Sequence, residues 1–146
     1  MHYDEALDRL LEGNKRYAAM QPTYPRQSTV HREQLVEVQY PFAAILSCSD
    51  SRVPSELIFD QGLGDLFIVR TAGHTINDMV LASLEYAVFV LHVPLIMVVG
   101  HRNCGAVTAV VEGKALPGHM AQLAESLWPA LRQVDRKAEN AVEQAI

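Results

Sequence analysis

The chain has only two cysteines and one tryptophan among its 146 residues, and it has no excess of positive charge. Its formal net charge is −5, and no run of lysine or arginine forms the basic stripe that nucleic-acid binding usually needs. The longest apolar stretch, residues 88–99, is interrupted by His92 and Pro94 and is too short to cross a bilayer. We therefore expect no nucleic-acid partner and no membrane span.

The first residues, Met1 to Leu7, lack the basic start and the apolar core of a signal peptide, so a cytoplasmic location is expected. In a reducing compartment, two cysteines favour metal binding or catalysis over a disulfide. A length of 146 residues, with 49% hydrophobic and 20% charged residues, indicates one globular domain spanning 1–146. Within it we expect a helical arm (1–40), an α/β core (41–113) and a helical segment (114–146).

Three short apolar runs without polar alternation predict strands that are buried on both faces: 41–47, 66–70 and 94–100. Apolar side chains at helical spacing predict helices over 4–20, 30–39, 78–91, 104–112 and 117–146, with a helical turn at 53–59. Alternating strands and helices indicate the α/β class, with a parallel β-sheet core and flanking helices. Three strands would leave a sheet edge bare, which either dimerisation across that edge or truncation of a longer protein would explain.

Two pairs of candidate metal-binding side chains directly follow predicted strands, and each pair contains one of the two cysteines. Cys48 and Asp50 lie in Ser-Cys-Ser-Asp-Ser-Arg after the first strand, and His101 and Cys104 lie in Gly-His-Arg-Asn-Cys-Gly after the third. If these strands are neighbours in a parallel sheet, all four side chains meet at its carboxyl edge. Taken singly, each cysteine is more often a small core residue than a ligand, and His101 and Asp50 could be ordinary loop or turn residues. Together, two thiolates, an imidazole and a carboxylate favour Zn²⁺.

Arg52 suggests that this site is more than structural. It lies two residues after Asp50, so in an extended loop both side chains project to the same side, and a guanidinium can hold a carboxylate through two parallel hydrogen bonds. With Asp50 held by Arg52, the fourth position of the metal is left to water, which zinc converts to a hydroxide nucleophile. With Asp50 released, its carboxylate is the fourth ligand and the site is closed. The sequence thus predicts a gate formed by Asp50 and Arg52.

The two motifs resemble the signature motifs of the β-class carbonic anhydrases. The resemblance is carried by Cys48-Ser-Asp-Ser-Arg52 and by Gly100-His-Arg-Asn-Cys-Gly105, and it extends over about residues 10–113, including the second strand with its turn and the crossover helix. It implies Zn²⁺ held by Cys48, His101 and Cys104, and the reversible hydration of carbon dioxide to bicarbonate and a proton by a carbonate dehydratase, a lyase. It also implies that Asp50 is the fourth ligand in the family's inactive form.

The resemblance implies further site residues and a homodimer or higher homo-oligomer. Gly105, at the start of the helix after Cys104, would offer its backbone N–H to bicarbonate. Gln61 is either a polar turn residue or the residue that faces substrate in the pocket of a partner subunit. His74 stands where the family commonly has asparagine, as a loop histidine or as a proton carrier. The family usually continues with a further strand beside 94–100, so the fold here would lack the C-terminal strand.

Other functions stay open at this point. A site with the same ligands can hydrolyse carbonyl sulfide or carbon disulfide, because pocket shape rather than the zinc ligands would decide the substrate. A zinc-bound but inactive homologue is a third reading. A nucleotide-binding α/β protein is disfavoured, because the loop after the first strand has no glycine-rich phosphate cradle.

Overall fold

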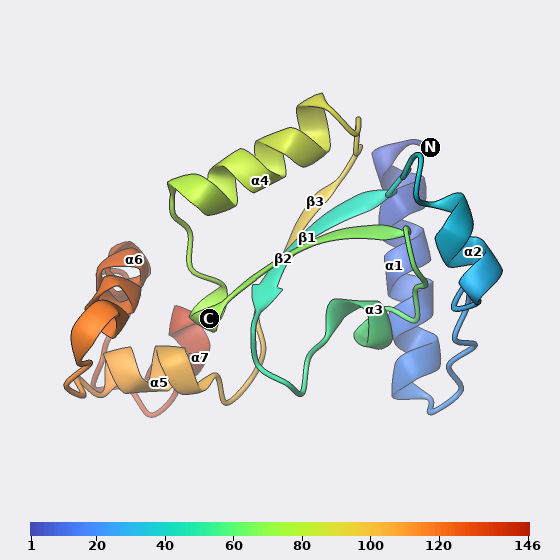
Figure 1. Cartoon of the computed structure of the whole chain (residues 1–146). Coiled ribbons are helices and arrows are strands. Elements are labelled where there is room, and N and C mark those ends of the chain that lie inside the picture. Colours follow the sequence, from blue (N-terminus) through green and yellow to red (C-terminus); the bar gives the residue numbers. More distant parts are fainter.

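The computed structural model describes residues 1–146 and contains a three-stranded parallel sheet surrounded by helices (Figure 1). The strands are β1 (Ala43–Cys48), β2 (Leu66–Thr71) and β3 (Ile96–Val99), in the order β2-β1-β3. The helices are α1 (Tyr3–Ala18), α2 (Thr29–Gln34), α3 (Ser55–Ile58), α4 (Asp78–Phe89), α5 (Gly105–Val111), α6 (Ala121–Leu131) and α7 (Ala141–Ala145), with 3-10 turns η1 (Ala72–His74) and η2 (Gly118–Met120). The predicted class and parallel sheet are confirmed.

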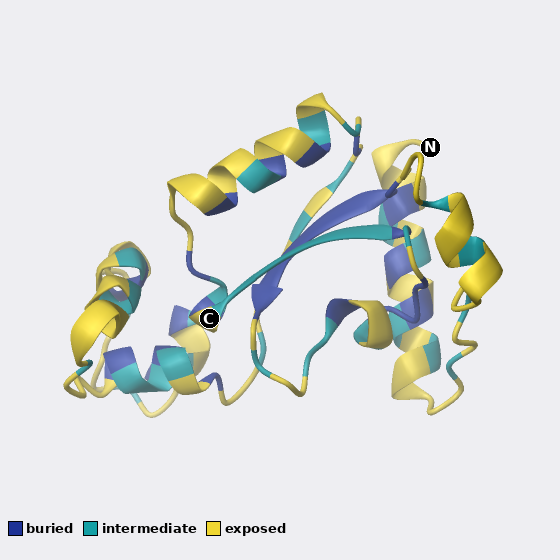
Figure 2. Ribbon diagram, viewed as in Figure 1, coloured by how far each residue is buried: buried dark blue, intermediate teal, exposed yellow.

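Strand β1 is the centre of the molecule, and all of its residues are buried (Figure 2). Ala43 and Ile45 pack on one face with residues of α1 and with Phe59, which follows α3. Ala44 and Leu46 pack on the other face against α4. Because both faces are covered, the strand has no need of polar alternation, as the sequence predicted.

The other two strands are less buried than predicted. Strand β2 is half-buried throughout, and β3 alternates between exposed and half-buried residues. Strand β3 pairs with β1 along one side only, and its Ile96 and Val98 side chains are 42% and 58% exposed. Helix α4 contacts β2 and packs over Phe67 and Val69, so it leaves these two side chains of β3 largely uncovered.

Two predicted helices were too long. The second helix ends at Gln34 rather than residue 39, and the segment 117–146 forms η2, α6 and α7 instead of one helix. A turn separates α6 from α7, in which Arg136 donates hydrogen bonds to the carbonyl of Val111. This turn folds α7 back, so that Ala141 and Ala145 pack in one cluster with Leu127 and residues of α5.

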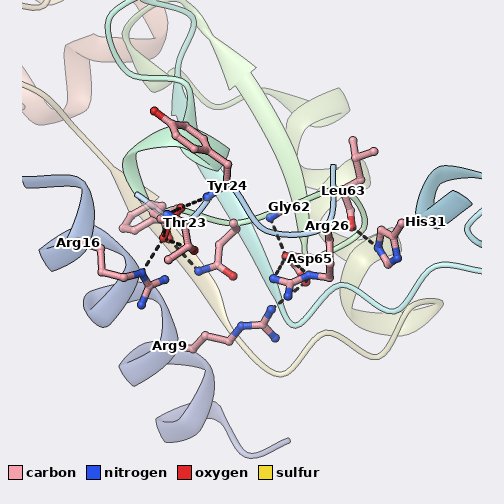
Figure 3. A network of polar contacts seen from close by, with 12 residues as sticks. Arg9, Arg16, Thr23, Tyr24, Arg26, His31, Gly62, Leu63 and Asp65 are labelled. Carbon is pink, nitrogen blue, oxygen red and sulfur yellow. Dashed lines mark hydrogen bonds and ion pairs between the residues drawn. The ribbon is translucent and has the colours of Figure 1, made fainter. Parts of the chain in front are cut away.

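Helix α1 and the connector after it are bound to the turn before β2 by two carboxylates. Asp60 has a fully buried side chain and accepts hydrogen bonds from Arg16 Nε at 2.6 Å and from the Thr23 N–H at 2.9 Å. Figure 3 shows Arg9 and Arg26 converging on Asp65. No helix of the structure is both long enough and apolar enough to pass through a membrane.

Candidate metal centre

The two predicted motifs meet at the carboxyl edge of the sheet. Cys48 is the last residue of β1, His101 lies just after β3, and Cys104 is the N-cap of α5. Because β1 and β3 are parallel neighbours, the loops that follow them lie together. The two Sγ atoms are 3.8 Å apart, and together with a His101 ring nitrogen they lie within 4.8 Å of one another. The predicted meeting of these three residues is confirmed.

The His101 ring is oriented as a metal ligand should be. Its Nδ1 lies 3.1 Å from the carbonyl oxygen of Arg102, which accepts a hydrogen bond when Nδ1 carries the proton. The lone pair is then on Nε2, which is buried and has no hydrogen-bond partner. A buried nitrogen acceptor without a donor is costly, and coordination of a metal ion removes that cost. The donor set therefore fits a borderline or soft ion such as Zn²⁺.

The two thiols have unequal acidities. Burial opposes ionisation of Cys48, but its surroundings outweigh this effect, among them hydrogen bonds from the backbone of Asp50 and from the Gly73 N–H, so the pKa of Cys48 lies below its ordinary value. The pKa of Cys104 is raised, first by burial and then by the nearby charge of Cys48. The surroundings alone thus favour ionisation of Cys48 only, whereas a bound cation would favour ionisation of both thiols.

Asp50 is held by Arg52 beside the three-residue cluster. The guanidinium donates from Nε to Oδ1 at 2.9 Å and from Nη2 to Oδ2 at 2.8 Å, and the Arg52 backbone N–H also donates to Oδ1. These hydrogen bonds hold the pKa of Asp50 well below its usual range and raise the pKa of Arg52. Asp50 Oδ2 lies 3.9 Å from His101 Nε2, so the carboxylate borders the cluster while bound to Arg52.

Two further residues shape the site, and the sequence analysis missed their role. Arg70, at the end of β2, donates from Nε to the carbonyl of Cys48 at 2.9 Å and from Nη2 to the carbonyl of Asp50 at 2.6 Å. Gly73 donates its N–H to Cys48 Sγ at 3.3 Å from a backbone φ of +67°, where glycine is favoured. The signal that the sequence offered is that Arg70 is a charged residue at the end of an otherwise apolar predicted strand.

The remaining predicted residues lie in different places. Gly105 begins α5 next to the cluster, and a Cβ added to it would meet no atom within 4 Å. His74 lies in η1, and burial lowers its pKa. Gln61 precedes β2, at the opposite edge of the sheet from the cluster of the same chain. It is buried, with Nε2 donating to the Phe59 carbonyl and Oε1 without a partner. The structure therefore does not bring Gln61 to the metal centre.

A sequence profile of the carbonic anhydrase family matches residues 43–145, which include the sheet and all three cluster residues. The β-carbonic anhydrase CcaA superposes with a TM-score of 0.71 at 30% sequence identity, covering 96% of this chain and 73% of that one. This chain belongs to the β-class carbonic anhydrase family. The β-carbonic anhydrase CafA of Aspergillus fumigatus also superposes, with a TM-score of 0.67, 30% identity and coverage of 92% of this chain and 67% of that chain.

Among curated carbonic anhydrases, carbonic anhydrase 2 of Mycobacterium tuberculosis is 51% identical over 126 residues. The alignment covers 84% of this chain and 61% of that protein. The carbonic anhydrase of Mycolicibacterium smegmatis is 48% identical over the same shares. This β-class chain thus spans about three-fifths of the length of these relatives.

Proposed function

We propose that this chain is a zinc-dependent carbonic anhydrase that catalyses the reversible hydration of carbon dioxide to bicarbonate and a proton. The observation that carries the proposal is the Cys48, His101 and Cys104 cluster with the paired Asp50 and Arg52 at its border. Membership of the β-class family supports the same reaction. We propose that residues 41–113 form the zinc-binding core, flanked by the N-terminal arm and the C-terminal helical segment.

Each residue of the cluster has a distinct task in this proposal. Cys48 and Cys104 would bind zinc through Sγ and balance its charge, and His101 would bind through the buried Nε2 that has no other partner. A zinc ion held by three protein ligands acts as a Lewis acid and supplies a nucleophile from water near neutral pH. Arg70 and Gly73 would keep the Cys48 sulfur in place through the backbone carbonyls and the N–H described above.

We propose that Asp50 gates the site. Its Oδ2 is 3.9 Å from His101 Nε2, so the carboxylate already borders the side chains that would hold the metal. To become a ligand it would have to give up its side-chain hydrogen bonds from Arg52. While these persist, Asp50 stays ionised and can accept a hydrogen bond from a group at the fourth metal position. The pairing with Arg52 therefore corresponds to the open site.

Substrate contacts and assembly complete the proposal. The backbone N–H of Gly105, the first residue of α5, would donate to bicarbonate. Gln61 lies far from the cluster of its own chain, so it could contact substrate only in a homodimer or higher oligomer, after turning its unpartnered Oε1 away from its present position. We propose a cytoplasmic location and carbon dioxide or bicarbonate as the small-molecule substrate.

The decisive experiment measures zinc content and carbon dioxide hydration on one preparation of the purified chain. We expect about one zinc ion per chain, with a hydration rate in stopped-flow that rises between about pH 6.5 and about pH 9. A His101→Ala variant should lose both zinc and activity. Zinc-loaded protein that hydrates no carbon dioxide at any pH would refute the proposal, and a carbonyl sulfide assay on that sample would then separate a sulfur-analogue hydrolase from an inactive homologue.

A further inference from the structure

Cys48 and Cys104 form an isolated pair of thiols in the interior. They are the only cysteines of the chain, both are buried, and neither is in a disulfide. Their Sγ atoms are 3.8 Å apart, which is van der Waals contact between sulfurs and less than 2 Å longer than a disulfide bond of about 2.05 Å. No other sulfur nucleophile is available to either of them. Whatever oxidises one thiol therefore leaves the other as its nearest reaction partner.

The backbone around the pair is rigid on one side and irregular on the other. Cys48 ends the central strand β1, and its carbonyl and Sγ are held by Arg70 and Gly73. Cys104 follows a short loop after β3 that is neither helix nor strand and includes Asn103 at a φ of +57°. That loop can supply the small shift of Cys104 toward Cys48 that bond formation needs.

We propose that Cys48 and Cys104 are a redox-sensitive modification site, at which a peroxide produces an intramolecular disulfide that excludes the metal. Hydrogen peroxide accepts two electrons from one thiolate sulfur: an S–O bond forms, the O–O bond breaks and hydroxide leaves. The second sulfur then attacks this sulfenic acid, forming the S–S bond, and its proton leaves with the hydroxyl as water. The net change converts two thiols and one peroxide into one disulfide and two waters.

Metal binding and the disulfide compete for the same atoms. A disulfide removes both sulfur ligands and leaves only His101 and the neighbouring Asp50, which are too few to retain zinc. A bound ion in turn engages both sulfurs and slows their oxidation. A small oxidant can approach the border of the site, since the Arg52 side chain is 56% exposed and a cavity of about 280 Å³ lies beside His101, between Gly100 and Ile146. The competition between zinc and the disulfide rests on the proposed function only because it takes both thiols as zinc ligands.

The test treats the metal-free, fully reduced chain with hydrogen peroxide and measures intact mass and free thiols. We expect a product about two mass units lighter, with no free thiol and no covalent dimer. After trypsin, peptide 33–52 should be linked to peptide 103–114, since no lysine or arginine interrupts either segment. A thiol reductant should restore both thiols and zinc uptake. In the zinc-loaded chain, zinc release followed with a chromogenic chelator should rise in step with the disulfide.

Two variants sharpen the test. Cys104→Ser removes the resolving sulfur, so Cys48 should gain about 32 mass units by oxidation to the sulfinic acid instead. His101→Ala keeps both thiols but loses zinc, so its disulfide should form faster than in the wild type when both are treated in the presence of zinc. A folded, metal-free wild type that keeps both thiols, gains oxygen on both sulfurs or links only between chains overturns the proposal. A chain that forms the disulfide when metal-free, but hydrates no carbon dioxide when reduced and zinc-loaded, would leave this inference standing and refute the proposed function instead.

Discussion

Arg52 determines where the Asp50 carboxylate lies, because it supplies both of the side-chain hydrogen bonds that hold it. In an Arg52→Ala variant, the released carboxylate should bind the metal and close the site. We expect kcat/KM for carbon dioxide hydration to fall at least about 100-fold while zinc content stays unchanged. Arg132→Ala, on an exposed side chain at the end of α6, controls for loss of one arginine. An Arg52→Ala enzyme with undiminished turnover would contradict the gating account.

Arg70 acts on the backbone instead of on a carboxylate. An Arg70→Met variant keeps an unbranched, flexible side chain but removes the guanidinium that donates to the carbonyls of Cys48 and Asp50. We expect zinc affinity to fall roughly 10- to 100-fold, as is typical when a residue that orients metal ligands is removed. Competition against a chelating dye measures it, with Arg32→Met in α2 as the control. Equal zinc affinities for the two variants would show that Arg70 only fills space.

At the level of secondary structure, the features that depend on short-range sequence patterns were predicted best. The unbroken apolar run before Cys48 predicted β1, and the two motifs after strands predicted the meeting of Cys48, His101 and Cys104 once β1 and β3 were taken as neighbours. Arg70 escaped prediction because its contacts reach across to the next strand, which spacing within one strand cannot indicate. The break between α6 and α7 was missed because it depends on Arg136 bonding to α5, a tertiary contact.

The attachment of helix α1 to Asp60 through Arg16 should make the stability of the fold depend on pH. Burial works against ionisation of this carboxyl, but Arg16 and Thr23 outweigh it and lower its pKa to about 2, from an ordinary 3.8. Because the pKa of Asp60 is lower in the folded state, its ionised carboxylate stabilises the fold at pH values above the unfolded-state pKa. This stabilisation is lost as the pH falls through the folded-state pKa. Asp60→Asn should therefore lower the free energy of unfolding by about 1–3 kcal/mol above pH 4, with the difference shrinking toward pH 2.

Urea unfolding of wild type and Asp60→Asn at several pH values between these limits measures this difference. Glu85→Gln removes an exposed carboxylate of α4 that makes no ion pair, and its stability should differ little from wild type throughout. If the deficit of Asp60→Asn were the same at every pH, the loss would come from shape or packing at Asp60 and not from its charge.

The molecule as a whole leaves apolar side chains uncovered at the β3 edge of the sheet and on α4. Strand β3 has a free edge with Ile96 and Val98 exposed, and Phe89, at the end of α4, is 72% exposed. Tyr86 and Val90 of the same helical region are also exposed. A bare strand edge and exposed apolar side chains are features that proteins normally cover with another chain or segment. We propose the β3 edge as the interface of the homo-oligomer expected from the sequence.

A single charge introduced at the β3 edge should prevent self-association while leaving the fold intact. We expect the wild-type chain to be larger than a monomer in size-exclusion chromatography with light scattering, and Val98→Lys to shift it toward monomer with an unchanged far-UV circular dichroism spectrum. Val36→Lys, at a side chain that is 81% exposed after α2, places the same charge elsewhere and should leave the oligomer intact. If both variants dissociate equally, the effect is net charge and not the β3 edge. A wild type that stays monomeric at all concentrations would refute self-association through this surface, because the exposed apolar residues would then have no second copy to cover them.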